Sequence, residues 1–214
     1  MSIHFRDPLA TFIHIPKTGG SSFSKWTKLN MPNKAERSQI NHISVIQAKQ
    51  LYKDLGFTFA FVRNPFARLV SMYHFIGQRA AERIEKRKQG RKVKQSTTNE
   101  EDLVIVSEYN KGFNYWIESW YYNTNNFMNT PNGEWNRRNP QSWWLDAPID
   151  LVIKLEEIDQ HFNKIQKLFK CNANLLHMNK STHQPYQDYY TPTTRKYVED
   201  LHREDFEKFD YDFS

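Results

Sequence analysis

Positions 13 to 23 hold the stretch Ile13-His14-Ile15-Pro16-Lys17-Thr18-Gly19-Gly20-Ser21-Ser22-Phe23. Its apolar start predicts a short buried strand over residues 11–15. Pro16 and the two glycines end that strand in a tight turn. Ser21 and Ser22 are good N-caps for the helix that follows. The chain therefore passes from strand to glycine turn to helix within a few residues.

This turn has the composition of an anion site, because free N–H groups and the positive end of a helix dipole meet there. Gly19 and Gly20 let the backbone approach an anion closely or adopt positive φ. Further donors come from Lys17 and from the hydroxyls of Thr18, Ser21 and Ser22. The pattern is not a G-x-x-x-x-G-K-[ST] loop, because its lysine precedes the glycines. By itself it remains open to a plain turn before a capped helix.

A second strand–turn–helix unit lies further along the chain. Phe57–Val62 is almost wholly apolar, as expected of a strand buried on both faces. Arg63 follows it, at the sheet edge where α/β proteins bind ligands. The dipeptide Asn64-Pro65 predicts a capped helix start. Arg68 and Ser71 share one face of that helix and could hold a second phosphate, although an exposed arginine pair with a helical serine is common.

Short apolar strands that alternate with helices predict an α/β fold with a mainly parallel central sheet flanked by helices. A third strand is expected over Leu151–Leu155. Further helices are expected from Ser44, over residues 113–121, after Ile158 and from Thr191. The 214 residues fit one domain, 1–214.

The net charge of +6 favours anionic ligands or partners. Much of the excess lies in a segment that we call the basic segment, residues 79–94, with Arg79, Arg83, Lys86, Arg87, Lys88, Arg91, Lys92 and Lys94. This segment could steer an anionic acceptor, or it could be a solvated helix extension.

Other functional classes are disfavoured by composition. The sequence has no apolar run of membrane-spanning length and no leader-like start, so we expect a cytoplasmic protein without a membrane span. Its one cysteine, Cys171, excludes an internal disulfide. The eight histidines show no metal-ligand spacing, so we expect no metal site.

The sequence resembles the PAPS-dependent sulfotransferases, which use 3′-phosphoadenosine 5′-phosphosulfate, and in particular their carbohydrate sulfotransferase branch. Residues 16–23 resemble the 5′-phosphosulfate loop of that family, and residues 61–73 resemble its 3′-phosphate element. Weaker similarities in order and spacing cover residues 41–44, 154–158, 177–181, 189–190 and 205–211. Residues 78–141 are the least covered, and we expect them to be a variable insertion on the acceptor side.

The resemblance implies a P-loop-like sulfotransferase fold and in-line transfer of a sulfuryl group from PAPS to an acceptor hydroxyl, with 3′-phosphoadenosine 5′-phosphate (PAP) as product. Lys17 is expected to stabilise the leaving oxygen. Arg63 and Ser71 are expected to hold the 3′-phosphate. The 5′-phosphate would be held by residues Thr18, Gly19, Gly20, Ser21 and Ser22. The acceptor would be a glycan or a small molecule.

His42 is the expected general base. A histidine has an unperturbed pKa near 6.5, which suits proton acceptance at neutral pH. His42 lies between the two phosphate elements, where the carbohydrate branch often carries a catalytic histidine. Without the resemblance, a capping or solvent-exposed histidine would be the favoured interpretation of His42. Glu156 and Glu157 are alternative carboxylate bases.

Three other functions remain open on the sequence. A P-loop-type kinase or NTPase would also bind phosphates on a strand–loop–helix unit, but Arg63 stands where a Mg²⁺-binding aspartate would be expected. A non-enzymatic nucleic-acid-binding module would use the basic segment, although we expect no nucleic acid partner. A degenerate relative would bind donor without turnover, which the retained Lys17, His42, Arg63 and Ser71 disfavour.

Overall fold

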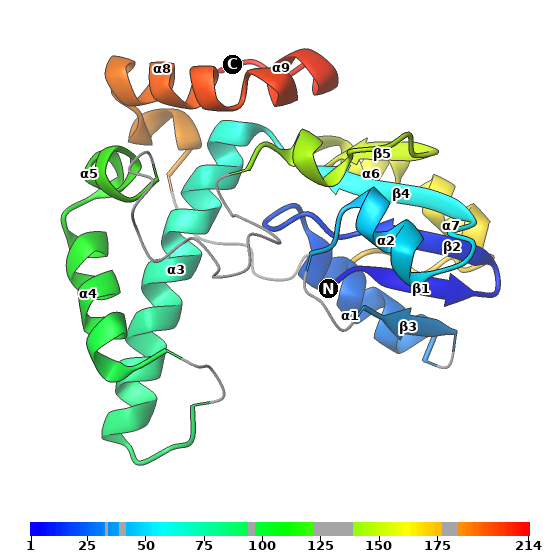
Figure 1. The fold of residues 1–214 in the computed structure, drawn as a ribbon, viewed down its shortest axis with the longest axis horizontal. Helices are drawn as coiled ribbons and strands as arrows, with labels where there is room; N and C mark the ends of the chain where they lie inside the picture. Colours follow the sequence, from blue (N-terminus) through cyan, green and yellow to red (C-terminus); the bar gives the residue numbers. More distant parts are fainter. Residues whose placement is uncertain (33, 39–41, 94–96, 122–138, 177–183) are drawn as a thin grey trace.

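The central sheet has five strands in the order β3-β1-β2-β4-β5 (Figure 1). The structure is a computed structural model that describes residues 1–32, 34–38, 42–93, 97–121, 139–176 and 184–214, and this strand count refers to those residues. The strands are β1 Ile3–Arg6, β2 Leu9–Ile13, β3 Ala35–Arg37, β4 Phe57–Val62 and β5 Leu151–Lys154.

The predicted α/β fold is confirmed, and the sheet is mixed. Strands β2, β4 and β5 run parallel, whereas β1 pairs antiparallel with both β2 and β3. The expectation of a mainly parallel sheet did not include β1 and β3, neither of which has a continuous apolar run. The parallel strands β2 and β4 directly precede the two segments that the sequence predicted to bind phosphate.

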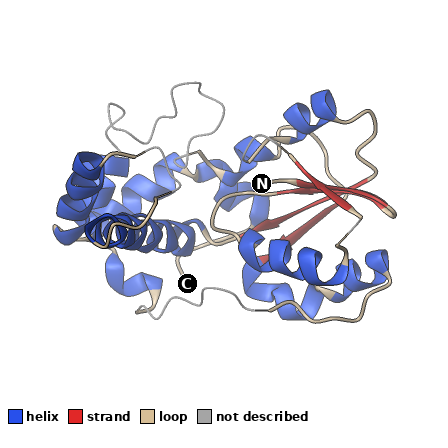
Figure 2. Cartoon of the chain, turned by 90° about the horizontal axis from the view of Figure 1, so that it is seen from below, coloured by secondary structure: helices blue, strands red, loops and turns tan. Residues whose placement is uncertain are grey.

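The longer helices are α1 Gly20–Asn30, α2 Val45–Leu51, α3 Pro65–Lys88, α4 Asn99–Asn110, α7 Asn163–Phe169, α8 Pro192–Leu201 and α9 Arg203–Phe209. Shorter helical segments are α5 Phe113–Trp116, η1 Ile117–Tyr121, η2 Gln141–Trp144, η3 Leu155–Glu157, α6 Ile158–His161 and η4 Tyr186–Tyr189. Helices lie on both sides of the sheet (Figure 2). Among the described residues, every helix is too short or too polar to span a bilayer.

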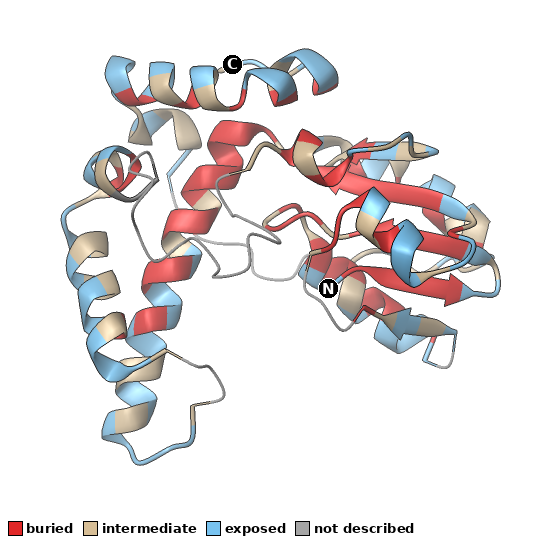
Figure 3. Ribbon diagram, viewed as in Figure 1, coloured by how far each residue is buried: buried red, intermediate tan, exposed pale blue. Residues whose placement is uncertain are grey.

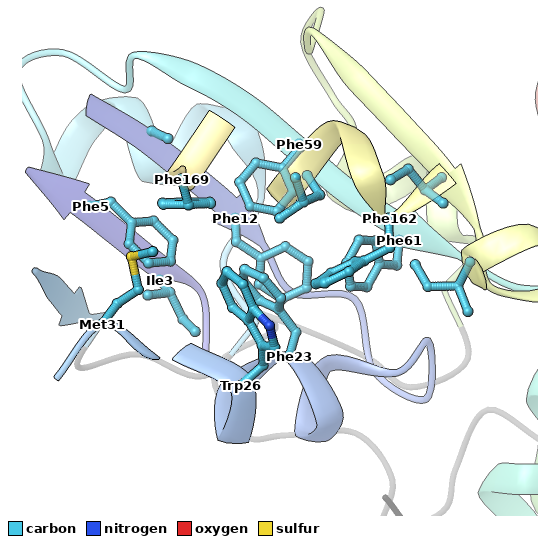
Figure 4. Close-up of a cluster of buried hydrophobic side chains, with 14 residues drawn as sticks. Ile3, Phe5, Phe12, Phe23, Trp26, Met31, Phe59, Phe61, Phe162 and Phe169 are labelled. Atoms are coloured by element: carbon cyan, nitrogen blue, oxygen red, sulfur yellow. The ribbon is translucent and has the colours of Figure 1, made fainter. Parts of the chain in front are cut away.

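The two faces of the sheet are buried against different helices, because successive side chains of a strand point to opposite faces. On one face, strand rings such as Phe12 and Phe59 pack against Phe23 and Trp26 of α1 and Phe169 of α7 (Figure 4). The opposite face is covered by α2 and η2 and contains Ile13, Ala60, Val62, Val45 and Trp144. Burial on both faces explains the continuous apolar run of β4.

Helix α3 leaves the carboxyl edge of the sheet and carries α4 along its far part (Figure 1). Its end near the sheet is buried and its far end is exposed (Figure 3). Arg83 and Arg87 of α3 both bind the carboxylate of Asp102 on α4, which is fully buried. Gly77 admits the Tyr109 ring, since a Cβ there would lie 2.3 Å from the ring. Residues 78–121 of the expected insertion thus contain the end of α3 and an unforeseen helix, α4.

Local start and stop signals account for several boundaries. Ser44 caps α2 with a capping box, and Asn64 caps α3 with Pro65 at its first position. The expectation for α1 was wrong: its N-cap is Gly19, so Ser21 and Ser22 lie in the first turn rather than capping it. The glycine loop therefore ends, and α1 begins, earlier in the sequence than the two serines suggested.

Candidate functional site

Three chain segments meet at the carboxyl edge of the parallel strands (Figure 1). The loop 14–19 follows β2, Arg63 follows β4, and Glu156 follows β5. Because parallel strands end at the same edge, residues far apart in sequence come together there. This edge is where α/β proteins usually bind ligands.

The loop after β2 has two residues in the left-handed region, Lys17 at φ 70° and Gly19 at φ 86°. A non-glycine residue in that region costs about 1–2 kcal/mol, so other contacts must hold Lys17 there. Gly20 opens α1, and a Cβ at this position would lie 1.9 Å from Nε2 of His14. Only glycine therefore fits beneath the His14 ring. The first N–H groups of α1 have no carbonyl partner within the helix, as at any helix N-terminus, and they face the loop that precedes it.

The hydroxyls of the loop differ in their environment. Thr18 is fully buried, and its hydroxyl donates to the Ile15 carbonyl at 3.0 Å. The single hydrogen of that hydroxyl stabilises the turn itself, so the contribution of Thr18 to an anion would come from its N–H group. Ser21 is exposed and Ser22 is buried. Of the three hydroxyls, that of Ser21 is the most accessible.

Helix α3 braces this loop at two points. The fully buried guanidinium of Arg68 donates to the Pro16 carbonyl at 3.1 Å, and to the Asn139 carbonyl at 3.0 Å. The ammonium of Lys17 lies 4.0 Å from the centre of the Phe75 ring. Since Arg68, Ser71 and Phe75 share one stripe of α3, the half-buried Ser71 faces the loop as well. Arg68 is therefore a support of the loop, whereas Ser71 remains available as a ligand.

The backbone of Arg63 is held by two hydrogen bonds, whereas its side chain has no direct hydrogen-bond partner among the described residues. Gln141 accepts from the Arg63 N–H at 2.8 Å and donates to the Arg63 carbonyl at 2.7 Å. Within the described part of the chain, the half-buried Arg63 guanidinium has no hydrogen-bond or ion-pair partner. Burial lowers the pKa of Arg63, and the nearby Glu156 carboxylate opposes that shift. A bound anion would give this partly buried cation a direct ion-pair partner.

Glu156 is engaged in holding the segments of the site together. Its carboxylate accepts from the Asn64 N–H and from the Tyr211 hydroxyl, both at 2.9 Å. Burial and this carboxylate raise the pKa of Tyr211, so the phenol stays protonated and donates. Both oxygens of Glu156 are thus engaged, and Glu157 pairs instead with His161 at 3.2 Å. Both carboxylates therefore have structural partners in the described part of the chain.

His42 is fixed in a specific tautomer. Its Nδ1 lies 2.9 Å from the His14 carbonyl, which can only accept, so Nδ1 carries the hydrogen. In the neutral ring Nε2 then carries the lone pair, as a general base requires. The backbone of His42 adopts φ 59°, and its carbonyl accepts from the Trp144 indole at 2.7 Å. The His42 ring lies 4.5 Å from the His14 ring, which itself packs on Gly20.

His14 is a neutral neighbour of His42. Burial, followed by the proximity of His42, lowers the pKa of His14 well below its ordinary value. A neutral His14 places no positive charge beside the His42 ring. His14 falls within the strand predicted over residues 11–15, and the structure brings its ring against both Gly20 and His42.

A buried polar cluster supports Arg63 from behind. Gln141 and Asp205 are both fully buried, and the Asp205 carboxylate accepts from the Gln141 N–H at 2.7 Å. Although burial raises the pKa of Asp205, hydrogen bonding to His202 and Gln141 and the charge of Arg68 lower it overall. Sequence patterns missed this cluster because Gln141 stands in a polar loop and its partners lie on the last helices.

The basic segment is not a continuous free patch. Arg83 and Arg87 are occupied by Asp102, and Arg79 pairs with Glu82 at 2.9 Å. Lys86, Lys88, Arg91 and Lys92 are exposed, whereas Lys94 lies outside the described residues. No group of three or more His, Cys, Asp or Glu side chains suited to a metal ion occurs in the described ranges.

Comparison with known proteins gives one match. The sequence model of the sulfotransferase family matches residues 7–212, a span that includes every residue placed at this edge. No curated protein and no solved structure matches the chain.

Proposed function

The chain belongs to the sulfotransferase family, and we propose that it transfers the sulfuryl group of PAPS to an acceptor hydroxyl by in-line displacement. The observation that carries this proposal is the pairing of two anion-binding features at one sheet edge. One is the glycine loop at the start of α1, and the other is the half-buried Arg63 guanidinium. PAPS has two separated phosphate-bearing ends, which this pairing would suit.

The loop after β2 would hold the 5′-phosphosulfate. The N–H groups at the start of α1 and the Ser21 and Ser22 hydroxyls would bind its oxygens. Lys17 would stabilise the negative charge that develops on the bridging oxygen as the S–O bond breaks. Because sulfuryl transfer resembles phosphoryl transfer with its loose transition state, positioning and charge stabilisation would supply most of the rate enhancement.

The 3′-phosphate would be held by Arg63 and Ser71. The Arg63 guanidinium would gain a direct ion-pair partner in addition to its electrostatic interaction with Glu156. Ser71 adds a hydroxyl from the face of α3 that carries Arg68 and Phe75. These contacts would distinguish PAPS and PAP from nucleotides without a 3′-phosphate.

His42 would be the general base. The acceptor hydroxyl would give its proton to Nε2 as the new O–S bond forms and the old S–O bond breaks, and PAP would leave with the electron pair. The hydrogen bond from Nδ1 to the His14 carbonyl supports this assignment because it orients the ring. The engagement of both Glu156 oxygens disfavours the carboxylate alternative.

The acceptor would be a hydroxyl compound, with a carbohydrate favoured by the resemblance to carbohydrate sulfotransferases. Residues 78–141 would lie on the acceptor side. A nucleic-acid-binding role finds less support, since three arginines of the basic segment already form ion pairs with Asp102 or Glu82.

Substitution of Arg63 by alanine tests the 3′-phosphate assignment. We expect the affinity for PAP to fall about 10- to 100-fold, because a hydrogen bond to a charged group contributes roughly 1.5–3 kcal/mol. The affinity for AMP, which lacks the 3′-phosphate, should stay unchanged. Titration calorimetry with both nucleotides measures the difference.

Arg6→Ala is the matched control, since Arg6 is exposed at the opposite edge of the sheet. It should leave both affinities as they are. An Arg63→Ala protein that folds and loses affinity for PAP and AMP equally would contradict the assignment.

A further inference from the structure

Phe75 is an exposed ring that carries two cations. It lies on α3 with 36% of its surface exposed, whereas its neighbours Tyr73 and Ile76 are buried in the core. The Lys17 ammonium lies 4.0 Å from its ring centre, and the Arg79 guanidinium lies 5.5 Å from it. Phe75 is therefore not part of the buried core of α3, and its ring contacts these two cations instead.

We propose that Phe75 is a positioning residue that holds the Lys17 ammonium at the reaction centre through a cation–π contact. This inference rests on the proposed role of Lys17 in sulfuryl transfer. It assigns to α3 a task beyond the 3′-phosphate contacts, because the same helix would set the position of the group that stabilises the leaving oxygen.

The backbone of the loop needs such a restraint. Lys17 has φ 70°, a left-handed backbone conformation that a lysine rarely adopts without support. Neighbouring contacts, rather than the intrinsic preference of the residue, therefore set the direction in which its side chain leaves the loop. Arg68 fixes the preceding carbonyl, that of Pro16, from within α3. Phe75 lies two turns further along the same stripe and contacts the end of the Lys17 side chain. Backbone and ammonium are thus both tied to one rigid helix.

An aromatic ring suits this task better than an acid. A carboxylate beside Lys17 would restrain the ammonium but would also compensate its charge and repel an anionic donor. A ring face attracts the cation through its quadrupole and leaves the net charge in place. Phe75 therefore restrains the side chain without weakening its ability to stabilise a developing negative charge.

Arg79 completes the arrangement. It covers part of the same ring from the next turn of α3, and its charge is compensated by Glu82 at 2.9 Å. Arg79 thus contacts the ring while its own charge is paired with Glu82. Phe75→Leu would remove the aromatic face while it keeps an apolar side chain of similar size.

A double-mutant cycle tests the proposal, with single-turnover sulfuryl transfer from PAPS as the measured rate. Phe75→Leu should slow transfer about 3- to 30-fold, the range expected for losing one cation–π contact. PAP affinity should stay within about 2-fold. Phe75→Trp should retain most of the rate because indole is a good cation–π partner. In the Lys17→Ala background, Phe75→Leu should have no further effect on the residual rate.

Phe57→Leu is the matched control. Phe57 has the same 36% exposure but begins β4, at the edge of the sheet remote from the loop. Equal slowing by Phe75→Leu in both backgrounds, or failure of Phe75→Trp to retain the rate, would overturn the proposal. If Lys17→Ala slows transfer strongly but Phe75→Leu does not, only the role of Phe75 fails. If Lys17→Ala itself turns over normally, the proposed role of Lys17 fails as well.

Discussion

Lys17→Ala is expected to lower kcat for sulfuryl transfer about 100- to 1,000-fold, the loss typical of removing one donor that stabilises transition-state charge. Lys17 is the cationic residue of the glycine loop. Its positive φ and its contact with Phe75 fix the direction in which its side chain leaves the loop. Its main task would arise only as the S–O bond breaks. The affinity for PAP should therefore change by no more than a few-fold.

Turnover and PAP affinity should be measured on the same preparations, so that the loss in kcat can be separated from a loss in binding. Lys25→Ala is a suitable control, because Lys25 is an exposed lysine of the neighbouring helix α1. Near-normal turnover in Lys17→Ala would remove this lysine from the chemistry. A parallel fall in kcat and PAP affinity would make it a binding residue instead.

His42→Ala is expected to reduce transfer about 100- to 10,000-fold, the usual contribution of a general base. The side chain donates from Nδ1 to the His14 carbonyl, so its loss removes an oriented proton acceptor. The Trp144 indole binds the backbone carbonyl of residue 42, and that contact survives the substitution. PAP affinity should therefore remain, and rates measured at saturating PAPS should report the loss.

His161→Ala provides the comparison, since His161 pairs with Glu157 on the surface of α6. It should transfer at the rate of the unaltered protein. An active His42→Ala protein would move the base elsewhere, with Glu156 as the first carboxylate to examine. Loss of both transfer and folding would be recognised by thermal unfolding of each variant.

Local signals predicted those elements of the fold whose causes lie within a few residues. β4 has the predicted bounds Phe57–Val62 because its apolar run is long enough to identify a fully buried strand. Ser44 and Asn64-Pro65 mark helix starts because capping is a local interaction. β3 was missed because it is three residues long and is defined by its pairing with the distant β1. β1 was missed because its sequence Ile3-His4-Phe5-Arg6 has no continuous apolar run of the kind that identifies β4 and β5.

The same distinction between local and remote causes applies to the candidate site. The glycine loop and Arg63 are evident from sequence because each follows directly on a strand. Their supports are not evident, because they come from remote segments: Gln141 clamps Arg63, and Phe75 contacts Lys17. Arg68 also shows this limit. Its spacing suggested a phosphate ligand, but the guanidinium is buried and holds the Pro16 and Asn139 carbonyls.

The central claim is that this sheet edge binds a nucleotide with a 3′-phosphate, and a thermal shift experiment with PAP, ADP, AMP and ATP–Mg²⁺ tests it most directly. A ligand that binds only the folded protein adds about 2.7 kcal/mol of stability at about 100 times its Kd, a clearly measurable shift. We expect stabilisation by PAP well above that by ADP or AMP. Stabilisation by ATP–Mg²⁺ alone, or by none of the four nucleotides, would contradict the account.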